Sequence, residues 1–82
     1  MARIIDYEAQ NVVGEKVKKF REERKLSQKD FSEKLETKAI YICRGSISRI
    51  ESHERTVTDF ELRAMAQILR VPIEELFEEM SV

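Results

Sequence analysis

The stretch from residue 28 to residue 51 constrains the fold of this chain more than any other. Phe31 and Leu35 lie four positions apart, and Ile47 and Ile50 lie three positions apart. Residues at these spacings share one face of a helix, so the stretch predicts two short helices, each with one apolar face. Two such helices bury their apolar faces most simply by packing across each other at a steep angle.

The second of these helices has a polar face that is predicted to point outward. That face carries hydrogen-bond donors and no carboxylate: Arg44, Ser46, Ser48 and Arg49. Phosphates and base edges accept hydrogen bonds from such side chains, so this helix is suited to lie against nucleic acid. Gly45, which has no side chain, would let the backbone approach a nucleic acid closely.

Five segments carry a resemblance to a known family, and they are residues 26–28, 31–35, 47–51, 59–62 and 71–77. In this order they resemble the helix-turn-helix family of the Cro and phage-repressor (XRE) type. The resemblance implies a sequence-specific regulator of transcription that binds double-stranded DNA. It also implies that Arg44 and Arg49 read base edges in the major groove. Gln28, together with the serines of the second helix, would fix the position of the protein on phosphates.

The resemblance also implies an all-α fold, a compact five-helix helix-turn-helix domain. Helical spacing of apolar residues and capping signals agree with it, and place helix starts near residues 12, 28, 44, 58 and 72. The first helix is expected to end near residue 25. The chain of 82 residues fits a single domain. Residues 1–10 would form an N-terminal arm, and residues 72–82 a closing helix with an acidic tail.

The connection between the two motif helices, residues 36–43, departs from the family pattern because it is several residues longer. Glu36 stands where the short turn of the family has glycine, and the longer connection is expected to remove the need for a left-handed glycine. Either Ile40 or Ile42 is expected to fill the core position that the family gives to a valine. Lys38 is expected to contribute a contact with DNA that does not depend on base sequence.

The resemblance further implies an ion pair between the first helix and the end of the second motif helix. The family pairs a glutamate at the position of Glu51 with an arginine that falls on Arg21. The planar fork of arginine matches a carboxylate with two hydrogen bonds, which lysine cannot do. This pair is expected to be largely buried and structural, without contact to DNA.

The charge of the chain is unevenly distributed. The net charge of −1 by itself argues against binding to phosphates. Residues 16–49, however, hold 11 Lys and Arg against 5 Asp and Glu, a net charge of +6. Residues 56–82 hold 2 basic against 6 acidic residues, a net charge of −4. The basic part coincides with the predicted DNA-binding helices, which favours nucleic acid as the partner.

Composition argues against several other functions. One cysteine, Cys43, and one histidine, His53, give too few ligands for a zinc site. Cys43 is interpreted as a small structural residue and His53 as part of a polar surface loop. No nucleophile–base pair, phosphate-binding glycine loop or cofactor motif is present, so neither an enzyme nor a bound metal or cofactor is expected. The chain has no apolar run long enough for a membrane span or a signal peptide, which predicts a cytoplasmic protein.

A homodimer is predicted because one motif covers only half of a two-fold symmetric DNA site. The apolar side of the closing helix supplies the expected subunit contact: Leu76, Phe77 and Met80. Two other functions stay open at this point. The chain could be an antitoxin or adaptor whose acidic closing helix binds a protein partner, or a controller protein of a restriction–modification system.

Overall fold

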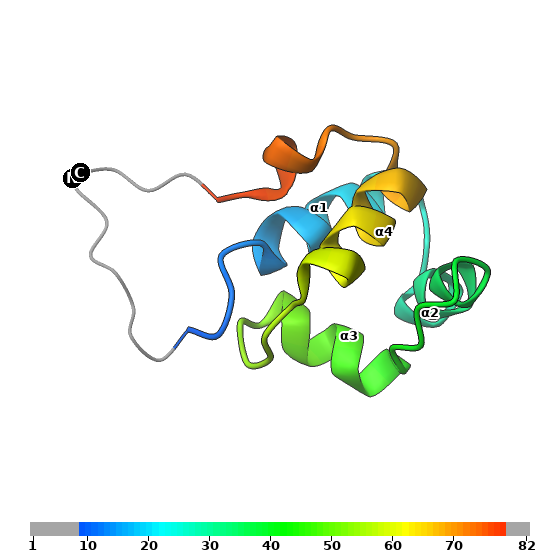
Figure 1. The fold of residues 1–82 in the computed structure, drawn as a ribbon, viewed down its shortest axis with the longest axis horizontal. Helices are drawn as coiled ribbons and strands as arrows, with labels where there is room; N and C mark the ends of the chain where they lie inside the picture. Colours follow the sequence, from blue (N-terminus) through cyan, green and yellow to red (C-terminus); the bar gives the residue numbers. More distant parts are fainter. Residues whose placement is uncertain (1–8, 79–82) are drawn as a thin grey trace.

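The computed structural model describes residues 9–78, which form four α-helices and one short 3-10 helix (Figure 1). The elements are α1 (Gly14–Glu23), α2 (Gln28–Glu36), α3 (Arg44–Glu51), α4 (Asp59–Leu69) and η1 (Ile73–Leu76). This part of the chain contains no strand, so the predicted all-α fold is confirmed. Only four of the five predicted helices are present, and α1 is shorter than expected at both ends.

The prediction of a fifth helix is wrong, because the closing segment, residues 72–78, makes a single 3-10 turn. Pro72 before η1 and Phe77 after it are both extended. A continuing helix would direct the N–H of Glu78 to the carbonyl of Glu74, but it donates to the carbonyl of Val12 at 2.8 Å. The side chain of Leu76 is fully buried in the core. Burial of one leucine and this bond to the start of the chain therefore fix an extended segment instead of a helix.

The core lies where α1 and α4 cross α2 and α3 (Figure 1). The apolar spacing predicted the contributions of α2 and α3 to it, since their buried side chains repeat at three and four positions. The largest fully buried side chains are Val17, Phe31, Leu35, Ile47, Ile50, Met65, Leu69 and Leu76. α3 packs against both α1 and α2, so its apolar face is covered and its other face is turned outward.

Two helices begin with the capping boxes that the sequence predicted. The hydroxyl of Ser27 accepts the N–H of Asp30 at 2.9 Å, and the carboxylate of Asp30 accepts the N–H of Ser27 at 3.1 Å. Thr58 and Glu61 make the same reciprocal pair at the start of α4. Each box satisfies two N–H groups that the first turn of a helix leaves unpaired.

All four α-helices end in the same way, with a non-glycine residue in the left-handed conformation. These residues have φ values of 58° at Lys25, 61° at Ala39, 66° at His53 and 60° at Arg70. At each end two backbone N–H groups fold back onto carbonyls of the last turn, as Ala39 does to Glu36 and Ile40 to Leu35. This is the Schellman arrangement, in which glycine is the favoured left-handed residue.

The long connection therefore still uses a left-handed residue, which corrects the expectation that its length removes that need. The extra residues after α2 wind into a further turn, and Ala39 takes the position where glycine is favoured. Ile42 then enters the core with 3% exposure, whereas Ile40 is only partly buried. The hydroxyl of the buried Ser32 donates to the carbonyl of Ile42 at 2.6 Å, which fixes the connection on α2.

Replacing Ala39 with glycine should stabilise the domain. A left-handed residue with a Cβ destabilises the folded chain by roughly 1–2 kcal/mol, and glycine removes this strain. Glycine also raises the conformational entropy of the unfolded chain, which lowers the stability by about 0.4–1 kcal/mol. We expect a net gain of about 0.5–1 kcal/mol, measured by urea unfolding. Lys38→Gly is the matched control, because Lys38 does not have a positive φ, and it should lose stability. An unchanged or lower stability of Ala39→Gly would contradict the strained turn.

Candidate nucleic-acid interface

A shallow groove separates the start of α2 from the exposed face of α3. Its volume is about 640 Å³, and it is lined by Ser27, Gln28, Lys29, Arg44, Gly45 and Ser48. The lining contains two cations and no carboxylate. The first turn of α2 adds positive partial charge from its N–H groups. This arrangement can receive a phosphate-bearing backbone beside the exposed face of α3.

The polar side chains of α3 point outward as the sequence predicted. Arg44, Ser48 and Arg49 are exposed, and a Cβ added at Gly45 would meet nothing within 4 Å. Ser46 is half-buried, and its hydroxyl accepts a hydrogen bond from Nη2 of Arg49 at 3.2 Å. This bond restrains the Arg49 side chain along the helix surface, which lowers the entropy that it would lose on binding.

The carboxylate of α3 is held on the opposite side. Nε of Arg21 donates to Oε2 of Glu51 at 2.6 Å, and Nη2 of Arg21 donates to Oε1 at 3.0 Å. The two side chains are 9% and 4% exposed. The hydrogen bonds with Glu51 raise the pKa of Arg21 above its ordinary value. Nη1 of Arg21 donates to the carbonyl of Leu26 at 2.7 Å, so the same guanidinium also fixes the α1–α2 turn.

Gln28 joins this network, a contact that the sequence did not reveal. Its Nε2 donates to Oε1 of Glu51 at 3.0 Å, and the residue also lines the groove. The Glu51 carboxylate thereby accepts three side-chain hydrogen bonds, which suits a buried charge. Gln28 is thus tied to the ion pair while its position is at the edge of the candidate DNA surface.

Asn11 and Gly14 fix the carboxyl end of α3 against the start of α1. Nδ2 of Asn11 donates to the carbonyls of Ile50 at 3.0 Å and of Arg55 at 2.8 Å. Its Oδ1 accepts the N–H groups of Val13 and Gly14, as a helix cap does. A Cβ added at Gly14 would lie 2.3 Å from the carbonyl oxygen of Ile50, so only glycine fits here.

Several other predicted residues lie apart from the groove. Lys38 is exposed beyond the end of α2, whereas the groove is at its start. Leu76, named for a subunit contact, is fully buried, while Phe77 is 47% exposed and Met80 lies outside the described residues. Lys29 lines the groove and was missed, although it adjoins Gln28.

Cys43, which was interpreted from the sequence as a small structural residue, is not buried. It is exposed at the N-cap of α3. Its thiol donates to the hydroxyl of Ser46 at 3.4 Å. Hydrogen bonding with Ser46 lowers the pKa of the Cys43 thiol below its ordinary value. The residue adjoins Arg44 and therefore borders the candidate DNA surface.

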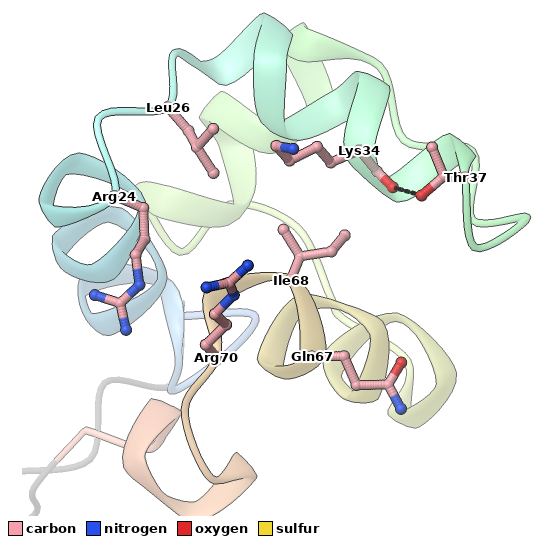
Figure 2. Close-up of a pocket in the computed structure, with 7 residues that line it drawn as sticks. All are labelled: Arg24, Leu26, Lys34, Thr37, Gln67, Ile68 and Arg70. Atoms are coloured by element: carbon pink, nitrogen blue, oxygen red, sulfur yellow. Dashed lines mark hydrogen bonds between the residues drawn. The ribbon is translucent and has the colours of Figure 1, made fainter.

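A second pocket, of about 450 Å³, lies between α1, α2 and α4 (Figure 2). Its lining includes three positively charged side chains, Arg24, Lys34 and Arg70, together with the apolar Leu26 and Ile68. These cations lie at the C-terminal ends of helices, where they offset the negative ends of the helix dipoles. The pocket shares no lining residue with the groove, so this positive charge lies outside the candidate DNA surface.

A capped helix crossed by an exposed helix of arginine and serine defines a helix-turn-helix domain that binds DNA. The family model described as "Helix-turn-helix" matches residues 17–76. The chain therefore belongs to this family, of the Cro and phage-repressor type, whose members are DNA-binding regulatory domains. No curated protein and no solved structure matches the chain. No helix within residues 9–78 is both long and apolar enough to cross a membrane.

The pair of Arg21 and Glu51 should be essential for stability. Glu51→Ala leaves a buried guanidinium without its carboxylate, which costs on the order of 3–5 kcal/mol. A domain of this size has roughly 5–15 kcal/mol in total, so the melting temperature should fall steeply. Arg49→Ala is the matched control on the exposed face of the same helix, and it should melt like the parent. Loss of DNA binding by Glu51→Ala at an unchanged melting temperature would place Glu51 in the DNA interface instead.

Proposed function

We propose that the chain is a sequence-specific transcriptional regulator, a repressor-like homodimer that places α3 in the major groove of a symmetric operator. One observation carries this proposal. α3 exposes Arg44, Ser48 and Arg49, while its carboxylate, Glu51, is withdrawn into the pair with Arg21. A helix that faces DNA with arginines and serines and without a carboxylate attracts phosphates and can read acceptor-rich base edges.

The exposed side chains of α3 divide into two roles. Arg44 and Arg49 read base edges, because a guanidinium can donate two hydrogen bonds to O6 and N7 of guanine. The hydroxyls of Ser46 and Ser48 donate to phosphates and fix the position of the helix. Gly45 has open space around its Cα, so the backbone can approach the sugar–phosphate chain at that point.

α2 contributes contacts from its first turn. Gln28 and Lys29 line the groove opposite Arg44, at the positive end of the helix dipole. Because Gln28 donates to Glu51, its side-chain amide is already oriented in the protein without DNA. The amide is uncharged, so it does not reduce the positive charge of the groove. Lys38, beyond the other end of α2, contributes at most an attraction to phosphates that is independent of base sequence.

Arg49→Ala should relax base preference at one position in each half-site and cost about 1–3 kcal/mol in binding. Binding sites are selected in vitro from a random DNA pool with the parent and the variant, and affinity is then measured on the selected site and on random DNA. Lys38→Ala is the control, with a small and uniform loss on both DNAs. Equal losses for Arg49→Ala on both DNAs would assign Arg49 to phosphate binding, and failure of the parent to select a site would refute sequence-specific binding.

Exposed apolar side chains on the closing segment support a homodimer. Ile73 is 39% and Phe77 is 47% exposed. The N–H of Glu78 bonds to the carbonyl of Val12, a residue that is 41% exposed, so Phe77 lies near a second exposed apolar residue at the start of α1. With Leu76 in the core, Phe77 is the principal candidate for the subunit contact.

Sedimentation of the parent at micromolar concentration, with and without operator DNA, should show a dimer. Phe77→Ser should shift this equilibrium to the monomer, because the exposed ring no longer gains from burial between subunits. Phe60→Ser is the matched control, since Phe60 is 64% exposed and belongs to α4 instead of the closing segment. A parent that remains monomeric even on DNA would refute the dimer, and an equal response of both variants would refute this contact.

A further inference from the structure

Three side chains from distant parts of the chain meet beside the start of α1. Glu15 lies in the first turn of α1, His53 follows α3, and Glu78 follows η1. One ligand atom of each, two carboxylate oxygens and an imidazole nitrogen, lie within 4.8 Å of one another. His53, predicted from the sequence to be a surface residue, is half-buried here.

Two of the three side chains are already held in place. Nε2 of His53 lies 3.0 Å from Oε1 and 2.8 Å from Oε2 of Glu78. The side chains of His53 and Glu78 are only 19% and 9% exposed. The backbone N–H of Glu15 donates to Oε2 of Glu78 at 2.8 Å. These contacts hold Nε2 of His53 against both oxygens of the Glu78 carboxylate, and an ion bound between them would replace this hydrogen bond.

The cluster has an excess of negative charge. Glu15 and Glu78 place two carboxylates around one imidazole, so their negative charges lie close together. A divalent cation at the centre would remove this repulsion and use the imidazole nitrogen as a ligand. Imidazole with carboxylates suits transition ions such as Zn²⁺, whereas Mg²⁺ and Ca²⁺ take oxygen ligands.

We propose that Glu15, His53 and Glu78 form a binding site for a divalent transition ion of the Zn²⁺ class. The three side chains provide three protein ligands and leave the fourth position to water. Ligand atoms around zinc lie about 2.0–2.2 Å from the ion, hence about 3.3–3.6 Å from one another in a tetrahedron. The exposed side chain of Glu15 can close the remaining distance by changing its rotamer.

The hydrogen bonds that orient these three residues agree with such a site. Ligands of metal ions are held by hydrogen bonds that orient them, and the N–H of Glu15 does this for Glu78. The backbone of His53 is fixed as well, because its carbonyl accepts the N–H of Gln10 at 2.9 Å and its N–H donates to Ile50 at 3.0 Å. A bound ion would connect α1, the end of α3 and the closing segment.

The test uses the full chain with Cys43→Ser, which removes the exposed thiol as a competing ligand. After chelation and dialysis, Zn²⁺ is titrated by calorimetry, and the ring resonances of His53 are followed by NMR. His53 is the only histidine in the chain, so these signals are unambiguous. We expect one Zn²⁺ per chain, a shift of the His53 ring signals and a higher melting temperature with the ion, because binding favours the folded state.

Glu15→Gln tests the site without disturbing the core, because Glu15 is exposed and its backbone N–H is retained. It should weaken Zn²⁺ binding by at least roughly 10-fold, and Glu78→Gln should do so as well. Glu74→Gln is the control, an exposed acid of η1 outside the cluster, and it should bind like the parent. Unshifted His53 signals in excess Zn²⁺ would overturn the proposal, as would Zn²⁺ binding that is unaffected by Glu15→Gln.

Discussion

The paired hydrogen bonds between Arg21 and Glu51 decide which face of α3 meets the surroundings. α3 has only 8 residues, too few for a helix that is stable alone. Its place depends on the apolar contacts of Ile47 and Ile50 and on this buried pair. The pair removes the carboxylate from the outward face, and through Gln28 it also reaches the start of α2. The exposed face of α3 carries arginines and serines without a carboxylate because the negative charge of Glu51 is buried.

The backbone supports the same arrangement from the other end of α3. Asn11 donates to the carbonyl of Ile50, and Gly14 lets α1 approach that carbonyl more closely than any side chain would permit. The closing segment then bonds to Val12 and covers the start of α1. The position of α3 is thus set by polar contacts to backbone groups as well as by the core, and these contacts have a defined direction that apolar packing lacks.

Local patterns predicted much of the fold. The capping boxes at Ser27 and Thr58 and the apolar spacing of four helices depend on residues within one turn of each other, so the sequence contains them directly. The same reasoning failed at the closing segment. Its apolar residues have helical spacing, but the N–H of Glu78 finds a carbonyl 66 positions earlier in the chain, at Val12. A long-range hydrogen bond of this kind leaves no local pattern.

The sequence by itself determined the class of the domain, the position of α3 and the polar residues on its outer face. Through family resemblance it also named Arg21 and Glu51 as partners. Only the tertiary structure decided which side chains border one groove, since Lys29 enters it and Lys38 does not. It also moved Leu76 into the core and brought Glu15, His53 and Glu78 together. The physical reason is that spacing along a chain fixes contacts within a helix, whereas contacts between helices depend on packing, which only the complete fold defines.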